Sequence, residues 1–146
     1  MNAEQLDEKK ALARRLGLED ADLLDKSPDK ILAVCNGIGP SFFPEKLRMA
    51  ISTLHPSLAL PADIHDLGYY YGQGTDEDWL EKNRRFRRNG VRMAKSNYGW
   101  YDPRRYLVEW DARRFAALCS TEPGRLAYYS AVMERLRDEE QQEENA

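Results

Sequence analysis

Apolar residues recur every three or four positions along most of this chain, with charged residues between them. In residues 3–16, Leu6, Leu12 and Leu16 lie among charges, a pattern typical of an amphipathic helix. The same spacing predicts further helices at 28–34, 44–54, 61–71, 76–96, 103–119 and 122–138. No segment alternates apolar and polar residues as a strand does. We therefore predict an all-α fold in one domain, residues 1–146, with 1–26 as an N-terminal helical extension and 138–146 as a frayed acidic tail.

Proline, glycine and hydroxyl side chains mark the expected helix ends. Ser27 before Pro28 is typical of a helix start, since serine caps free backbone N–H groups and proline fits the first turn. Thr75 is expected to cap the long helix that follows it, whose first turn is acidic. Gly72 and Gly74 leave only a short turn before that cap, so the two helices around it should form an antiparallel pair.

Composition indicates a compact protein with a charged surface. The chain is 42% hydrophobic and 32% charged, and no apolar run approaches the roughly 20 residues of a membrane span. The charged start, M-N-A-E-Q-L-D-E-K-K, lacks the apolar stretch of a signal peptide, so the cytoplasm is the default compartment, with export by another route left open. Two cysteines make no disulfide framework, so we expect reduced thiols, with a single Cys35–Cys119 bridge as the alternative.

A basic cluster interrupts an otherwise acidic chain of net charge -3. Its members are Arg84, Arg85, Arg87, Arg88 and Arg92. The cluster could face anionic lipid headgroups through Arg84, Arg85 and Arg88, or form a solvated helix face. The acidic overall charge and the lack of interleaved aromatics argue against a nucleic-acid partner.

The segment 61–74, P-A-D-I-H-D-L-G-Y-Y-Y-G-Q-G, carries the most distinctive chemistry. His65 can move protons near neutral pH, and the adjacent Asp66 can hold a hard cation such as calcium. Tyr69 lies one helical turn beyond His65, on the same face. A base beside a metal ligand suits attack of water on a carbonyl. The alternative is a helix that packs its aromatics, with His65 as a hydrogen-bonded core residue.

On the next helix, Asn83 is predicted on the buried face. It lies four residues after Trp79 and three before Phe86, in a stripe that continues to Gly90. A buried amide requires hydrogen bonds, and His65 on the antiparallel neighbour is a plausible partner. The alternative partner of Asn83 is a backbone carbonyl or a water.

Metal binding by Asp66 requires more oxygen ligands, since calcium takes six to eight. The loop N-G-I-G-P, residues 36–40, could supply backbone carbonyls, although Asn-Gly is also a common helix end. Asp66 could instead pair with an arginine. Zinc is disfavoured, because its candidate ligands contain no closely spaced pair. Those candidates are Cys35, His55, His65 and Cys119.

The pattern P-A-D-I-H-D-L-G-Y, followed by N-R-R-F, resembles phospholipase A2. It is most similar to the short bacterial and fungal secreted forms and to the phospholipase domain of parvovirus capsids. There, H-D-x-x-Y lies on one helix, a D-x-x-F-like pattern on the next antiparallel helix, and a glycine-bearing calcium loop upstream. The resemblance spans about Cys35 to Phe86. It implies an all-α, phospholipase A2-like helix pair that hydrolyses phospholipid or related esters with calcium.

The resemblance also implies roles for individual residues. His65 would be the base that activates water, and Tyr69 would support its hydrogen-bond network. Asp66 would ligate calcium together with the segment that contains Cys35, Gly37 and Gly39, and the Gly37 amide would lie near the developing oxyanion. Asn83 stands where the family has the carboxylate that orients the histidine.

Two other functions remain open at this stage. The first is a catalytically silent, phospholipase A2-like binding or effector module of phage origin, which the neutral Asn83 favours. The second is a different hydrolase, such as a peptidase that uses His65 and Asp66.

Overall fold

The computed structural model describes residues 1–35 and 45–146, and of residues 45–48 only the backbone. This part of the chain is mostly helical and contains no strand, which confirms the all-α class. The elements are α1 (Ala3–Leu16), η1 (Ala21–Asp25), α2 (Pro28–Cys35), α3 (Glu45–Ser52), η3 (Pro56–Leu58), α4 (Ala59–Tyr70), α5 (Asp76–Asn97), α6 (Pro103–Cys119) and α7 (Glu122–Glu144).

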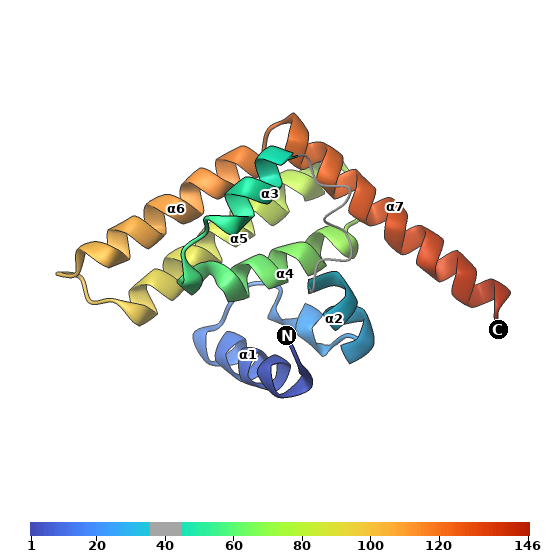
Figure 1. Ribbon diagram of the computed structural model, residues 1–146, viewed down its shortest axis with the longest axis horizontal. Coiled ribbons are helices and arrows are strands. Elements are labelled where there is room, and N and C mark those ends of the chain that lie inside the picture. Colours follow the sequence, from blue (N-terminus) through green and yellow to red (C-terminus); the bar gives the residue numbers. More distant parts are fainter. Residues whose placement is uncertain (36–44) are drawn as a thin grey trace.

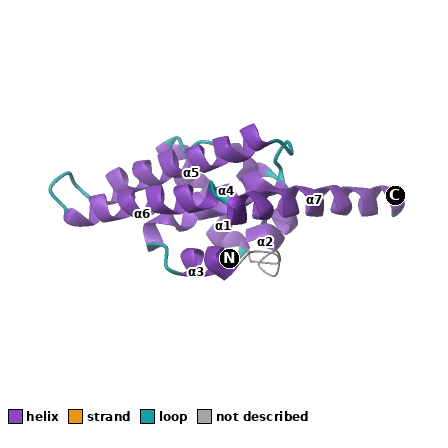
Figure 2. Cartoon of the chain, turned by 90° about the horizontal axis from the view of Figure 1, so that it is seen from above, coloured by secondary structure: helices purple, strands orange, loops and turns teal. Residues whose placement is uncertain are grey.

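Three helices that are consecutive in sequence form the centre of the molecule. α4 and α5 run antiparallel, and α6 returns along the other side of α5 (Figure 1). The segments α1, η1 and α2 pack on α4, away from α6, while α3 contacts α6 and α7. Figure 2 shows that α7 leaves this body and extends beyond it at one end.

Local sequence explains why the helices around the candidate site begin where they do. The Thr75 side chain accepts a hydrogen bond from the Asp78 N–H and caps α5, as the sequence predicts. Asp102 caps α6 in the same way, with Pro103 in the first turn. α4 begins at Ala59, two residues before the predicted start at Pro61, because the preceding 3-10 turn leads directly into it. Proline is tolerated there because the first-turn N–H groups need no helical acceptor.

Two hydrophobic cores meet at α4, and this explains how deeply that helix is buried. One core lies between α4, α5, α6 and α7 and includes Tyr69, Phe86 and Phe115. The other lies between α4 and the N-terminal segments and includes Ile64 and Leu67. Residues 1–26, expected as an extension, therefore contribute core side chains: Leu6, Ala13, Leu18 and Leu24.

A glycine permits the close approach of α5 to α6. A Cβ atom on Gly90 would lie 2.6 Å from the Cβ of Ala112, inside van der Waals contact. Gly90 lies two turns beyond Asn83 on the predicted stripe, and both residues are buried. This close packing fixes the buried stripe of α5 against α6. Ser120, which hydrogen-bonds Asn83, directly follows α6.

The last helix is longer than predicted. α7 runs to Glu144, whereas the sequence pattern predicts an end near Asp138. Asp138 accepts hydrogen bonds from the Tyr70 hydroxyl at 2.6 Å and from Lys30 at 3.3 Å, and the residues after it are exposed. The continuation arises because these residues, mostly Glu and Gln, are good helix formers. That this acidic end frays stays a prediction.

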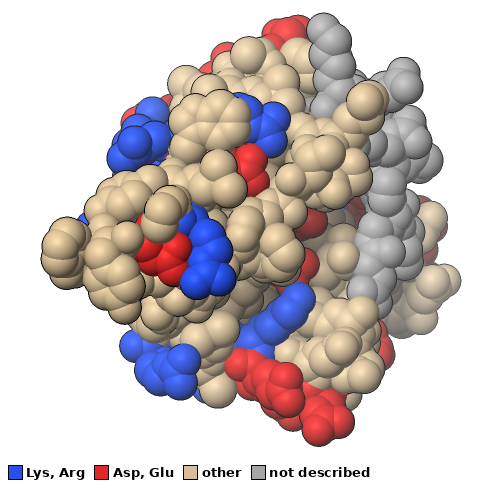
Figure 3. Space-filling model, turned by 60° about the vertical axis from the view of Figure 1, so that its left-hand side comes forward, with Lys and Arg blue, Asp and Glu red and all other residues tan. Residues whose placement is uncertain are grey.

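The end of the molecule formed by the α5–α6 turn exposes several large apolar side chains. They are Trp100, Tyr101, Tyr106, Leu107 and Trp110. Figure 3 looks onto this end, where uncharged atoms cover most of the face and charged groups are scattered among them. Across residues 1–35 and 45–146, no helix combines the length and apolarity that a bilayer crossing requires.

Candidate active site

His65 lies inside the molecule, enclosed by aromatic rings from three helices. Its side chain is 6% exposed. Its ring centroid is 4.2 Å from that of Tyr69 on α4, 5.3 Å from that of Phe86 on α5 and 6.1 Å from that of Phe115 on α6. This enclosure follows from the position of α4 between two cores, which place buried side chains on both sides of the helix at His65.

The polar partner of His65 is Asn83, as the buried stripe on α5 predicts. His65 Nε2 lies 2.8 Å from Asn83 Oδ1, and the Tyr69 hydroxyl donates to the same oxygen at 2.5 Å. Asn83 is 1% exposed, so its amide depends on these contacts. The predicted burial of His65 against Asn83 is confirmed, and Tyr69 belongs to the same network.

Ser120 determines which way the Asn83 amide faces. The Ser120 hydroxyl donates to the Ala116 carbonyl at 2.8 Å, so its oxygen accepts from Asn83 Nδ2 at 3.1 Å. Asn83 Oδ1 must then point to His65 and can only accept. The shared hydrogen therefore belongs to His65 Nε2. In the neutral ring this leaves Nδ1 as a free proton acceptor, and Nδ1 has no hydrogen-bond partner in the described part of the chain.

Burial lowers the pKa of His65 from 6.5 to about 4. Loss of hydration is the main cause, the hydrogen bond to Asn83 opposes it, and the nearby charge of Lys82 lowers the pKa further. The ring is thus neutral near pH 7, the state in which it can accept a proton. The same pKa means that an imidazolium is poorly stabilised here, mainly because burial removes its hydration.

A small cavity adjoins His65 on the side of the N-terminal segment. Its volume is about 10 Å³, and besides His65 its lining includes Pro61, Gly68, Lys82 and Asn89. A cavity of this size holds about one water molecule. It offers polar groups that such a water requires, but it has no room for an ester substrate.

Asp66 is a half-buried carboxylate that lacks a counter-ion among the described residues. Burial, and secondarily the charge of Asp63, raises its pKa from 3.8 to about 8. Asp63 itself is paired with Lys9. No described arginine side chain pairs with Asp66, but that of Arg48 lies outside the described part, so the arginine alternative stays a prediction. A carboxyl group at this position can release its proton to bind a cation supplied from elsewhere.

The end of α2 lies against the same part of α4. The Cys35 thiol donates to the Asp63 carbonyl at 3.8 Å. Its pKa is raised by burial and by the charges of Asp63 and Asp66, so the thiol stays protonated. Cys35 thus brings the chain to the neighbourhood of Asp66 immediately before residue 36. Gly37 and Gly39, the expected carbonyl donors, lie outside the described residues.

The four residues considered as zinc ligands do not gather in one place. His55 lies at the start of η3, where its ring accepts from the Ser57 N–H, and Cys119 is buried in the core of the helix bundle. In the portion that the structure describes, no three His, Cys, Asp or Glu residues gather as a metal site would require. Both thiols are free, so the Cys35–Cys119 bridge is not present.

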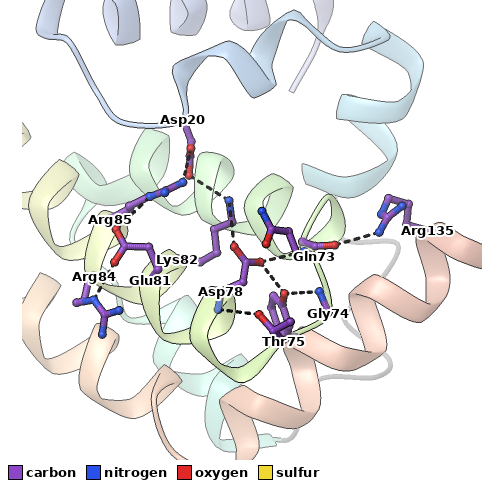
Figure 4. Close-up of polar contacts among 12 residues, drawn as sticks. Asp20, Gln73, Gly74, Thr75, Asp78, Glu81, Lys82, Arg84, Arg85 and Arg135 are labelled. Atoms are coloured by element: carbon purple, nitrogen blue, oxygen red, sulfur yellow. Dashed lines mark hydrogen bonds and ion pairs between the residues drawn. The ribbon is translucent and has the colours of Figure 1, made fainter.

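The basic cluster of α5 is mostly occupied by internal ion pairs. Arg88 binds Glu19 at 2.6 Å, Arg85 binds Asp20 at 2.8 Å, and both reach Glu81. Figure 4 shows Arg85 between Glu81 and Asp20. These pairs join the N-terminal segment to α5. Arg85 and Arg88 are therefore poorly placed to form the expected lipid contact, whereas Arg84 bonds only its own helix neighbour Glu81.

A second network fixes the turn between α4 and α5, and with it the register of His65 against Asn83. The Tyr128 hydroxyl donates to Asp78 at 2.6 Å and accepts from the Gly74 N–H at 2.9 Å. The Gln73 N–H donates to the same carboxylate, and Lys82 lies 3.9 Å from its other oxygen (Figure 4). The short turn is thus tied to α7 as well as to the start of α5.

The opposite pKa shifts of Asp66 and His65 predict how stability changes with pH. Between about pH 4 and 6.5 the folded state holds an extra proton on Asp66 and lacks one on His65, so the two effects oppose each other. Between pH 6.5 and 8 only Asp66 contributes. The folded state then binds more protons than the unfolded state, so the free energy of unfolding falls as pH rises, by at most about 1.4 kcal/mol per pH unit.

Urea unfolding in calcium-free buffer at pH 6.5 and pH 8 measures this fall. Asp66→Asn should remove it, because the amide does not titrate. Equal dependence on pH in parent and variant would contradict the assignment of the proton to Asp66.

Comparison with known proteins finds no relative: no family model, curated protein or solved structure matches this chain. The function is therefore argued from the residues and their geometry.

Proposed function

We propose that this chain is a calcium-dependent hydrolase of phospholipid or related ester bonds, with a phospholipase A2-like site. The observation that carries the proposal is the pairing of His65 Nε2 with Asn83 Oδ1 beside Asp66, a carboxyl group with no counter-ion among the side chains that the structure describes. A neutral, oriented imidazole beside a carboxyl group that releases its proton on binding a cation would supply a base and a cation ligand. The sequence resemblance to phospholipase A2 supports the same assignment.

In this mechanism His65 Nδ1 accepts the proton of the attacking water and later returns it to the leaving alkoxide. Asn83 holds the ring by its Nε2–H, and Tyr69 and Ser120 hold Asn83. Asp66, a hard oxygen ligand whose pKa is raised by burial and by the charge of Asp63, would be one of the calcium ligands. When bound, calcium would polarise the ester carbonyl and stabilise the negative charge on its oxygen.

The neutral amide predicts a slow enzyme. Proton abstraction leaves an imidazolium enclosed by Tyr69, Phe86 and Phe115, and Asn83 offers it a dipole in place of a charge. The low pKa of His65 in the free protein reflects the same free-energy cost of forming an imidazolium here. A general base acts best when its pKa lies near the working pH, and this one lies below it.

The exposed aromatic end of the molecule supports a lipid substrate over a water-soluble ester. Trp100 and Trp110 are 74% and 60% exposed, and Tyr101 is exposed beside them. Trp and Tyr are suited to the headgroup region of a bilayer, where the ring is apolar and one edge is polar. Lys95, in the last turn of α5 before this end, is exposed and has no ion pair or hydrogen bond within the described chain, so it can face anionic headgroups.

We therefore expect phospholipid vesicles to shift the tryptophan emission of this protein to shorter wavelength. Trp100→Ser with Tyr101→Ser should weaken vesicle binding at least about a hundredfold, since each aromatic side chain contributes about 1.5–3 kcal/mol when buried and about 1.4 kcal/mol corresponds to tenfold. Met133→Ser is a matched control, because Met133 is 54% exposed on a different helix. Equal loss in both variants would contradict a specific role for the α5–α6 turn.

The decisive test of the function measures fatty-acid release from mixed phospholipid vesicles with calcium and with a chelator. We expect release only with calcium. Calcium should also raise the melting temperature of the parent and not that of Asp66→Asn, because binding to the folded state stabilises it. Absence of release under both conditions, together with no thermal shift, would refute the proposal.

A silent binding module is the second candidate, and one observation favours it. Every polar atom of Asn83 that faces His65, Tyr69 or Ser120 is satisfied, as in a structural brace. A module of this kind would keep the fold and the thermal stability while showing neither hydrolysis nor a calcium-dependent shift.

A further inference from the structure

A groove between α5 and α6 lies on the far side of Asn83 from His65. Its volume is about 250 Å³, and it is lined by Arg84 and Arg87 from α5 and by Arg113, Ala116, Ala117 and Ser120 from α6, with Asn83 in its wall. The alanines leave the space that larger side chains would fill. None of these lining residues is acidic.

Two of the arginines have no polar partner within the described part of the chain. Arg87 and Arg113 form no ion pair or hydrogen bond with the described residues, in contrast to Arg85 and Arg88 on the other face of α5. Arg84 keeps one contact, to Glu81 at 2.9 Å. Guanidinium groups from two helices thus face one hollow without compensating charge. These positive charges, which have no acidic partner in the groove, are suited to binding an anion.

We propose that this groove binds a phosphate monoester group. Arginine presents paired N–H donors that match phosphate oxygens, and a phosphate accepts more such bonds than a carboxylate. The volume is below the usual 300–1,000 Å³ of a drug-sized pocket, so it suits one small charged group. The chain as a whole has net charge -3, so binding of an anion at this place depends on the local arginines.

Asn83 links this groove to the candidate active site. Its Nδ2 side belongs to the groove wall with Ser120, and its Oδ1 side binds His65 and Tyr69. A phosphate near Arg87 and Arg113 therefore perturbs the amide that orients His65. The proposal itself does not rest on hydrolysis, since it concerns binding at a separate surface.

The test titrates inorganic phosphate into calcium-free protein and follows the arginine Nε–H and Asn83 Nδ2 signals by NMR, with affinity from calorimetry. Arg87→Gln with Arg113→Gln should weaken binding at least tenfold. Arg15→Gln with Arg137→Gln is the matched control, because both residues are exposed and unpaired within the described chain and lie on α1 and α7. The control should bind within twofold of the parent.

A second arm distinguishes a free phosphate from a lipid headgroup. Vesicles of phosphatidylcholine with and without phosphatidic acid are sedimented with parent and variants. Binding of inorganic phosphate that needs Arg87 and Arg113 supports the site with a soluble ligand. Retention only on phosphatidic acid vesicles, lost in the groove variant, supports it with a lipid ligand. No binding in either arm, or equal binding in groove and control variants with unchanged melting curves, overturns the proposal.

Discussion

Replacing His65 with alanine should reduce calcium-dependent ester hydrolysis to the uncatalysed rate. The substitution removes the only base that the site places beside Asp66, and a positioned base typically contributes 10²–10⁴-fold. Fatty-acid release from vesicles measures the effect. Retained activity would place the chemistry on another residue.

Two companion variants separate loss of the base from loss of the fold. His65→Ala leaves a space among Tyr69, Phe86 and Phe115 and so costs stability. His65→Gln keeps a donor for Asn83 Oδ1 and fills most of that space, yet it cannot accept a proton as imidazole does. It should be more stable than His65→Ala and equally inactive. His55→Asn, which keeps an acceptor for the Ser57 N–H, should retain activity.

The substitution Asn83→Asp should raise turnover about tenfold or more. A carboxylate 2.8 Å from His65 Nε2 favours the imidazolium that forms during proton abstraction and so raises the histidine pKa above about 4. One pKa unit corresponds to about 1.4 kcal/mol, or tenfold in an equilibrium constant. The acid limb of the pH–rate profile should move to higher pH, because activity requires the neutral ring.

The stability of the Asn83→Asp variant tests the role of Asn83 independently of its turnover. A buried carboxylate is costly unless His65 is protonated beside it, so Asn83→Asp should lose stability as pH rises through the new histidine pKa. Ser120→Ala is a useful comparison, since it frees Asn83 Nδ2 without adding charge. It should cost about 1 kcal/mol with the acid limb unmoved. An Asn83→Asp variant that is fully stable yet slower than the parent would contradict the orienting role of Asn83.

Much of the fold could be read from local sequence, because local interactions decide it. Thr75 and the acidic turn after it fix the start of α5, and Pro103 fixes the start of α6, through caps that involve only near neighbours. The contact of His65 with Asn83 was also predictable. One polar residue on an apolar stripe, facing a helix joined by a short turn, leaves few partners within reach.

The length of α7 could not be read in the same way. The sequence places a charged, Glu-rich end after Asp138, and such residues form helix or coil with little difference in free energy. Tyr70 and Lys30 anchor Asp138 from distant parts of the chain, and the helix continues to Glu144.

What the sequence determined by itself was the helical class, the caps and the adjacent pair of a base and a carboxylate. Tertiary structure decided the environment of that pair. Ser120 orients Asn83 across 37 residues of chain, and two cores enclose α4 so that the pKa of His65 falls and that of Asp66 rises. Tertiary structure also decided which arginines of α5 form ion pairs with acidic side chains. The reason is that hydration, charge pairing and amide orientation depend on side chains that meet only after distant helices pack.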